Sequence, residues 1–200
     1  MGAHARIIGV LLCASAFASG AQAQAVLDTG VVYNPNSGDL RIPVTAQVSP
    51  QCGFATAPNG SVNQPDFDVT GIPAADFTFQ LECSGPSRVA IVSQNGGLLT
   101  GGTVPAGYAT LAPYDVELNV VANNNADNFN DSCTAEDLAA NNGCSFYGTA
   151  SGTVGGFIPS PSVGQNGSYV RVSAQVYAGT AILVDGTYND ILTVTLSAAP

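Results

Sequence analysis

This chain of 200 residues contains no lysine and no tryptophan, and it has a single histidine and four arginines. Lysine and histidine are the usual bases that activate a serine or cysteine nucleophile, so their scarcity argues against that kind of catalysis. Acidic residues outnumber the cations and set the formal net charge at −10. A surface of that sign excludes nucleic-acid binding by neutralisation of phosphates. We therefore expect no catalytic residue, no cofactor site and no nucleic-acid partner.

The first 23 residues have the three parts of a secretory signal peptide. A short basic start (1–6) precedes an apolar run (7–17), and an Ala-x-Ala cleavage site follows at 21–23, overlapped by a second at 23–25. The apolar run is too short to span roughly 30 Å of hydrocarbon as a membrane anchor. We predict cleavage of the signal peptide 1–23, export of the remainder, and no membrane insertion afterwards.

Cleavage would change the histidine content and the net charge of the mature chain. It removes His4, the only histidine, and leaves three arginines against fourteen acidic residues, a formal charge of −11. Residues 24–39 include the turn-forming stretch Asn34-Pro35-Asn36-Ser37-Gly38 and are predicted to form a flexible N-terminal extension. The remainder, 40–200, has the length of one domain.

Four cysteines remain after Cys13 leaves with the signal peptide: Cys52, Cys83, Cys133 and Cys144. An even number in an exported chain predicts two disulfides, and four cysteines allow three pairings. We favour Cys52–Cys83, which would tie two strand regions together, with Cys133–Cys144, which would close a short loop. A metal site is the alternative, but the chain lacks Cys-x-x-Cys spacing and the mature part lacks histidine, so we expect no metal.

Short segments with alternating apolar and polar residues recur along the chain, the pattern of strands with one buried face. The clearest are 40–48, 77–83, 114–120, 170–176 and 188–196. In the second of them the alternation places Cys83 toward the core. The dipeptides Asn95-Gly96 and Asp185-Gly186 predict hairpin turns. One short helix is expected within 134–142, with Thr134 as its N-cap and Asp137 three residues on. No segment has a long helical period, so the sequence predicts an all-β fold, a β-sandwich with disulfides.

Three other patterns have weaker functional interpretations. Asp115 and Glu117 share a strand face and could form a glycosidase pair, although such pairs are usually solvated surface residues. The run 123–131 is rich in asparagine and aspartate and could offer oxygen ligands to calcium, but it lacks the EF-hand register and its glycine, which favours a polar loop. Exposed tyrosines could bind carbohydrate, and the candidates are Tyr108, Tyr114, Tyr147 and Tyr177.

The start and the end of the domain together resemble a known family. One alternating strand runs into Cys52, a second ends on Cys83, and the chain closes with Gly186-Thr187-Tyr188-Asn189-Asp190-Ile191-Leu192-Thr193-Val194-Thr195-Leu196. This combination resembles the spore coat protein U family, which includes subunits of archaic chaperone–usher pili. The closing segment is similar to that family's final strand, Gly-x-Tyr-x-Asp-x-x-x-Val-x-Leu. The Asn-rich loop with the second cysteine pair departs from the family pattern as an insertion, and the extension before Leu40 is longer than a minimal pilin start.

The resemblance implies a pilin-type, immunoglobulin-like sandwich that is incomplete by one strand. A periplasmic chaperone would fill the gap first, and the N-terminal strand of a neighbouring subunit would replace it at an outer-membrane usher, so that copies of the chain polymerise into a surface fibre by strand addition. The best donor is 40–48, whose apolar side chains are Leu40, Ile42, Val44, Ala46 and Val48. A second donor candidate is 26–33, and 40–48 could instead be the first strand of its own domain. A self-complete coat or matrix protein and a carbohydrate-binding adhesin module are the alternative functions.

Overall fold

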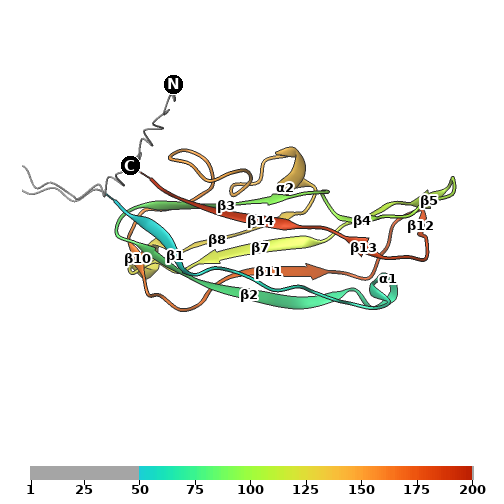
Figure 1. Ribbon diagram of the computed structural model, residues 1–200, viewed down its shortest axis with the longest axis horizontal. Helices are drawn as coiled ribbons and strands as arrows, with labels where there is room; N and C mark the ends of the chain where they lie inside the picture. Colours follow the sequence, from blue (N-terminus) through green and yellow to red (C-terminus); the bar gives the residue numbers. More distant parts are fainter. Residues whose placement is uncertain (1–49, 200) are drawn as a thin grey trace, which may run out of the picture. The chain divides into compact units, whose positions relative to one another are not determined.

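The computed structural model describes residues 50–199, and these form mostly β-structure (Figure 1). The predicted signal peptide 1–23, the extension 24–39 and the donor segment 40–48 lie outside the described residues. The strands are β1 (Cys52–Thr56), β2 (Ile72–Cys83), β3 (Ser87–Ser93), β4 (Leu98–Thr100), β5 (Tyr108–Ala109), β6 (Leu111–Ala112), β7 (Asp115–Val120), β8 (Phe129–Thr134), β9 (Gly156–Ile158), β10 (Ser162–Val163), β11 (Ser168–Ala174), β12 (Ile182–Leu183), β13 (Tyr188–Asn189) and β14 (Leu192–Ala198). The helical turns are α1 (Phe67–Thr70), η1 (Asn125–Asp127) and α2 (Asp137–Ala140).

Two antiparallel sheets dominate the fold. The larger has the order β1-β2-β11-β7-β8, with β10 also paired to β2, and the second has the order β14-β3-β9. A small antiparallel sheet, β13-β4-β6, and a parallel pair, β12-β5, complete the structure. The prediction of an all-β fold with antiparallel sheets and two disulfides is confirmed.

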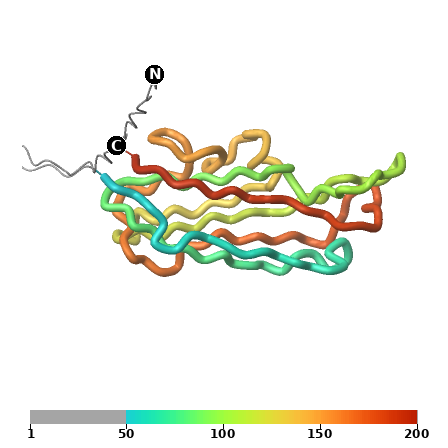
Figure 2. Tube along the Cα trace, viewed as in Figure 1, coloured from blue at the N-terminus to red at the C-terminus, as the bar shows by residue number. Residues whose placement is uncertain are grey.

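The second sheet and the small sheet continue one another, as the trace in Figure 2 shows. Strand β3 pairs with β14, and β4 pairs with β13. In the chain β4 follows β3, and β13 precedes β14. The hairpin predicted at Asn95-Gly96 is therefore wrong, because β3 and β4 are successive parts of one run and not partners. The predicted hairpin at Asp185-Gly186 is also wrong, since β12 pairs with β5 whereas β13 pairs with β4.

Both large sheets contribute to one hydrophobic core. Its fully buried members include Phe79, Leu81, Val116 and Leu118 from the first sheet and Val89, Ile91 and Ile158 from the second. The alternation predicted for 77–83 and 114–120 is confirmed, and Cys83 faces the core. The strand predicted over 170–176 is shifted by two residues toward the N-terminus, because β11 runs from Ser168 to Ala174. Val176 lies beyond that end and is exposed.

The two disulfides are Cys52–Cys83 and Cys133–Cys144, the pairing that the sequence favoured. Cys52 and Cys83 are direct partners in the β1–β2 ladder, so the first disulfide fastens the start of the described chain to the largest sheet. Disulfides of this kind form in oxidising, exported compartments. Within residues 50–199, no helix has the length and apolarity to cross a membrane.

The residues predicted as the helix cap lie at the start of α2, but the N-cap is Glu136, so the prediction of Thr134 as N-cap is wrong. The Thr134 hydroxyl accepts the Asp137 backbone N–H at 3.2 Å, and the Asp137 carboxylate accepts the Thr134 backbone N–H at 3.2 Å. This reciprocal pair satisfies donors that the first turn of a helix leaves without a partner. The helix buries Leu138 in the core, which explains why so short a helix is ordered.

Candidate functional site

The most unusual feature of the described chain is the open edge of β14. Among the described residues, this strand ends the order β14-β3-β9 and pairs with β3 alone, from Leu192 opposite Ser93 to Ala198 opposite Ser87. Its sequence, Leu-Thr-Val-Thr-Leu-Ser-Ala, contains no charge and no proline. Natural proteins usually blunt edge strands with lysine, proline or a covering loop, because an open edge is a template for another strand. β14 has no such protection in its own side chains.

The inward-facing side chains of β14 are incompletely covered. Leu192, Val194 and Leu196 pack against the core but remain half-buried. On the neighbouring β3, Val89 and Ile91 are completely buried. The two strands belong to one sheet, so this difference means that the core is open along β14 and closed along β3.

Residues 57–66 run from the end of β1 to α1 and form the opposite wall of this opening. The pairing of β1 with β2 stops at Thr56, and in the described chain the backbone of 57–65 makes no hydrogen bond with other backbone groups. Pro58 and Pro65 carry no backbone N–H, and Asn59-Gly60 lies between them. This composition explains why the segment does not extend the ladder of β1.

A groove with a volume of about 1120 Å³ lies between these two walls. Its apolar lining includes the half-buried Phe77, Leu98 and Val172 together with the buried Ile72 and Val170. These side chains come from the inward faces of β2, β4 and β11, so the floor of the groove is the hydrophobic core itself. Such a surface suits an apolar occupant, because each buried aliphatic side chain stabilises a complex by roughly 1.5–3 kcal/mol.

The groove ends at a polar cluster around Asp190, between β13 and β14. The Asp190 carboxylate accepts hydrogen bonds from the Tyr114 hydroxyl (2.7 Å), the Ser93 hydroxyl (2.6 Å) and the Asn95 backbone N–H (3.0 Å). Tyr114 precedes β7 in the first sheet and Ser93 ends β3 in the second, so one carboxylate joins both sheets. Burial, and then the neighbouring Asp190 carboxylate, raises the pKa of the Tyr114 phenol well above its ordinary value. Asp190 therefore fixes the chain where β14 begins.

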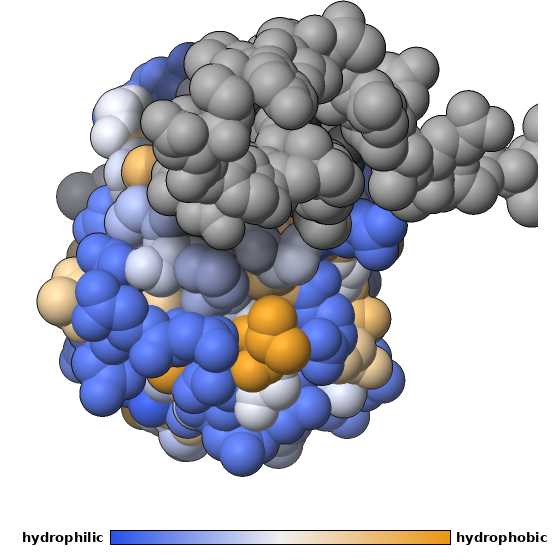
Figure 3. All heavy atoms as spheres, turned by 90° about the vertical axis from the view of Figure 1, so that its left-hand side faces the viewer, coloured by the Kyte–Doolittle hydropathy of each residue, from blue (hydrophilic) through white to orange (hydrophobic). Residues whose placement is uncertain are grey.

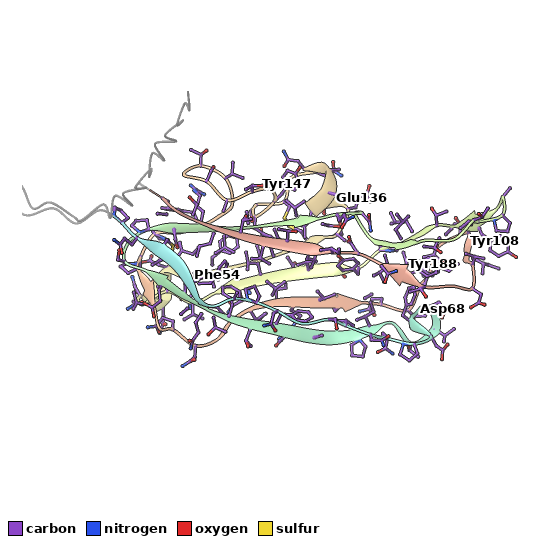
Figure 4. The ribbon with its side chains drawn as sticks, viewed as in Figure 1. Phe54, Asp68, Tyr108, Glu136, Tyr147 and Tyr188 are labelled. Atoms are coloured by element: carbon purple, nitrogen blue, oxygen red, sulfur yellow. A yellow bond between two sulfur atoms is a disulfide. The ribbon has the colours of Figure 1, made fainter. Side chains whose placement is uncertain are left out.

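The rim at this end of the groove is acidic. Asp66, Asp68, Asp185 and Asp190 are among the residues that line it, and in the described chain no arginine is. The rings of Phe67 and Tyr188 meet edge to face at a centroid distance of 5.5 Å, so α1 and β13 contact each other there; Figure 4 labels Tyr188. The groove thus has an apolar floor and an acidic end.

The chemistry that this arrangement supports is recognition of an extended chain. β14 offers an open row of backbone donors and acceptors, and the groove beside it offers space for side chains that alternate along a strand. No group of His, Cys, Asp and Glu residues in the described part of the chain has the arrangement of a metal site. Among the described residues that line the groove, none is a histidine, a lysine or a cysteine.

The proposed glycosidase pair belongs to a different surface. On the outer face of the first sheet, Glu117 accepts hydrogen bonds from Asn130 (3.0 Å) and Tyr169 (2.7 Å) and contacts Arg171. Hydrogen bonds from Asn130 and Tyr169 and the nearby Arg171 lower the pKa of the Glu117 carboxyl. Glu117 is thus held as a carboxylate within a surface network, and Asp115 is not part of that network.

The Asn-rich run forms a loop braced by its own side chains. Asn123 Oδ1 accepts the Val163 backbone N–H at 2.8 Å, and Asn128 Oδ1 accepts the Ala122 backbone N–H at 2.9 Å. Asp127 accepts hydrogen bonds from Asn124 and Ser160. Side-chain oxygens of Asn123, Asp127 and Asn128 are therefore hydrogen-bonded to protein donors, which favours the interpretation as a polar loop.

The four candidate tyrosines do not form one binding surface. Tyr114 is buried in the core, which excludes it as a surface ligand for carbohydrate. Tyr108 lies at the β5–β12 end, whereas Tyr147 lies beside α2, well away from it (Figure 4). Tyr177 is half-buried and donates its hydroxyl to the Ala181 carbonyl.

Comparison of this chain with family models, curated proteins and solved structures found no match. The resemblance to the spore coat protein U family therefore remains a prediction from motifs. Sequence reasoning did not identify 57–66 as a wall of the groove, although its prolines and glycine were a usable signal. It also missed the joining role of Asp190, which only the motif Tyr-x-Asp could have suggested.

Proposed function

We propose that this protein is an exported subunit of a surface fibre, assembled by addition of residues 40–48 of one copy to the β14 edge of the next. The domain would then be a pilin-type, immunoglobulin-like sandwich that lacks one strand. The observation that carries this proposal is the half-buried inward face of an uncharged edge strand beside a groove floored by the core.

The donor segment matches the groove in chemistry. Leu40, Ile42, Val44, Ala46 and Val48 alternate with polar residues, so an extended strand presents all five side chains on one face. That face would cover the exposed sides of Leu192, Val194 and Leu196. The other face of the donor, with Arg41, Thr45 and Gln47, would remain in solvent.

The donor segment also matches β14 in length and register. Nine residues of 40–48 exceed the seven residues of β14, so the strand can pair along the whole edge. The ladders around β14 are antiparallel, and antiparallel pairing is slightly more stable per residue than parallel pairing. In an antiparallel ladder with Val44 opposite Val194, Ile42 lies opposite Leu196 and Ala46 opposite Leu192.

An open groove is a hazard until it is filled, since unpaired apolar edges aggregate. The proposed function therefore includes a periplasmic chaperone that occupies the groove in transit and an outer-membrane usher at which the donor replaces it. The mature product is a homopolymer at the cell surface, without catalytic activity.

The test uses two variants of the full mature chain that form a disulfide only if the segments meet. One carries Val44→Cys and the other Val194→Cys, and they are mixed during refolding under mild oxidation. A covalent dimer of the two variants is the expected product on a non-reducing gel. Thr45→Cys mixed with Val194→Cys is the matched control, because residue 45 of an extended donor points away from the groove.

A variant with both cysteines in one chain distinguishes exchange between copies from the alternative in which the domain completes itself. A link between copies in the mixture, with a ladder of multimers from the double variant, supports exchange. A monomer linked only within itself, with no dimer from the mixture, would show that 40–48 fills the groove of its own domain. Absence of both links would show that another segment or protein occupies the groove.

A further inference from the structure

We infer that four exposed apolar side chains at the far end of the domain form the surface on which the next copy of the chain rests in the fibre. This apolar tip consists of Leu99, Tyr108, Leu111 and Ile182. The inference rests on the proposed function, since it concerns how two copies joined by a donated strand contact each other.

The apolar tip is built by strand pairing. Leu99 and Leu111 are direct partners in the β4–β6 ladder and are 40% and 37% exposed. Tyr108 and Ile182 are direct partners in the β5–β12 pair and are 46% and 72% exposed. Single exposed apolar residues are ordinary, but these two pairs lie on successive strands, with Tyr108 and Leu111 three residues apart in the chain. A group of this kind is a candidate interaction surface.

The tip and the ends of the described chain lie at opposite ends of the domain. In Figure 1, β1 begins and β14 ends at one end, whereas β5, β12 and β13 lie at the other. A donor antiparallel to β14 runs from the end where β14 finishes toward the end where β14 begins. It therefore leaves the groove near Asp190, beside the apolar tip, and its own domain must follow there.

The tether between donor and domain is short. Cys52, the first residue of β1, comes four residues after Val48, and four extended residues span at most about 14 Å. Asn189 at the exit of the groove is the direct partner of Leu99 in the β13–β4 ladder. The next domain thus begins within a few residues' reach of the tip, and it cannot be placed far from it.

The end of the next copy that would contact the tip has its own apolar element. Figure 3 shows this end of the domain, where mostly polar residues surround a small apolar spot. Val163 on β10 is exposed, and it pairs with Glu82 one residue before the Cys52–Cys83 disulfide. A contact between two different patches is heterologous, and repeated heterologous contacts build open fibres instead of closed dimers.

A parallel donor would produce a different assembly. It would leave the acceptor at the end where β14 finishes, so the two domains would meet through the same end. Two copies could then exchange strands reciprocally and form a closed dimer, with the apolar tips of both copies in solvent. The antiparallel ladders of the second sheet and the apolar tip both favour the open fibre.

Photo-crosslinking of the full mature chain tests the inference. Tyr108→p-benzoylphenylalanine places the probe on the tip, and Val154→p-benzoylphenylalanine, at an exposed apolar position outside it, is the control. Polymers are formed, irradiated and analysed by peptide mapping. We expect position 108 to link to peptides of another copy that contain residues 50–53, 82–87 or 160–165, and position 154 not to do so. Links from tip to tip, or none to another copy, would overturn the inference.

A second experiment measures how much the apolar tip contributes to the stability of the polymer. Leu99→Gln with Leu111→Gln changes exposed positions, so the domain should still fold, and the Val44–Val194 cysteine link should still form. We expect polymers of this variant to dissociate about tenfold faster than the parent. An unchanged dissociation rate would contradict the inference.

The two tests distinguish the inference from the proposed function. If the cysteine link between copies forms but the tip cross-links are absent, only the inference is wrong. If the cysteine link between copies never forms, the proposed function and this inference are both wrong.

Discussion

The second sheet has two edges, and they differ completely in how they are covered. On one side of β3, the strand β9 and the segment that follows α2 close the sheet. On the other side, β14 pairs with β3 over seven residues; in the described chain its outer backbone has no strand partner and its inward side chains are half-buried.

The covered edge is protected by several independent contacts. The Ile91 backbone N–H donates to the Phe146 carbonyl at 2.8 Å, and Phe146 itself is buried in the core. Arg88 donates to the Gly155 carbonyl at 2.7 Å and lies over the Phe157 ring at 4.6 Å. These contacts occupy the side of β3 that faces away from β14, so no further strand can pair with β3 there. The open edge is therefore specific to β14 and is not shared by the β9 side of the sheet.

Substitutions in the donor segment 40–48, which is proposed to occupy the open edge, should reduce polymerisation most strongly. Ile42→Asp together with Val44→Asp places two carboxylates where the groove floor is apolar, and burying an unpaired charge is strongly unfavourable. We expect complete loss of polymers in size-exclusion chromatography with light scattering. Thr45→Asp, on the solvent face of the donor, should polymerise like the parent. Equal polymerisation of both variants would contradict the role of 40–48.

Loss of the disulfide near the covered edge should reduce the stability of the domain without preventing polymerisation. Cys133→Ser with Cys144→Ser removes the disulfide that ties β8 to the segment before Phe146. We expect a loss of about 2–4 kcal/mol in the free energy of unfolding, measured in urea. Polymerisation under folding conditions should persist, because the groove lies on the other side of β3. Loss of polymers from a variant that is still folded would show that the two edges are coupled.

Asp190 is predicted to matter for stability at the end of the open edge. Asp190→Ala leaves the buried Tyr114 hydroxyl without its acceptor, and such losses cost about 1–3 kcal/mol. Asp190→Asn keeps an acceptor oxygen and should lose less. Urea unfolding of the two variants gives the comparison, and an alanine variant as stable as the parent would show that Asp190 does not hold β14 in place.

The smallest effect concerns the outer face of the first sheet, which neither edge uses. A paired guanidinium of Arg171 lowers the pKa of Asp76, and hydrogen bonds from Asn130 and Tyr169 lower that of Glu117. Carboxyls with depressed pKa values stabilise the fold above their ordinary range and lose that contribution as the pH falls through the lowered values. We expect a small decrease in thermal stability below about pH 4, reduced in Asp76→Asn, because exposed ion pairs contribute little. An identical acid profile for variant and parent would contradict this account of Asp76.

Local patterns were sufficient to predict much of the fold. Alternation over 77–83 and 114–120 identified β2 and β7 and their buried faces, because a two-residue period depends only on neighbouring residues. The reciprocal hydrogen bonds between Thr134 and Asp137 were predictable for the same reason, since the two residues are three apart, although the N-cap of α2 is Glu136. The even number of cysteines predicted two disulfides, and the favoured pairing is the one present.

The errors came from contacts between distant residues. Asn95-Gly96 has a local preference for a hairpin. However, the Asp190 carboxylate, 95 residues away in sequence, accepts the Asn95 backbone N–H. The dipeptide therefore separates β3 from β4 without turning the chain back. The groove could not be predicted either, because it arises where 57–66 makes no ladder and where, in the described chain, β14 has no hydrogen-bonded strand on its outer side. A missing partner leaves no periodic signal in the sequence.

Hydrogen exchange of the β14 amides would report directly whether a neighbouring copy pairs with this edge. Residues 192–198 are compared in polymers of the mature chain and in the monomeric Ile42→Asp/Val44→Asp variant, with β9 as the internal reference. If a neighbouring copy adds a strand to the open edge, the outward-facing amides of β14 become protected in the polymer while those of β9 stay unchanged. Equal protection of β14 in the polymer and the monomer would show that this edge is not where the copies join.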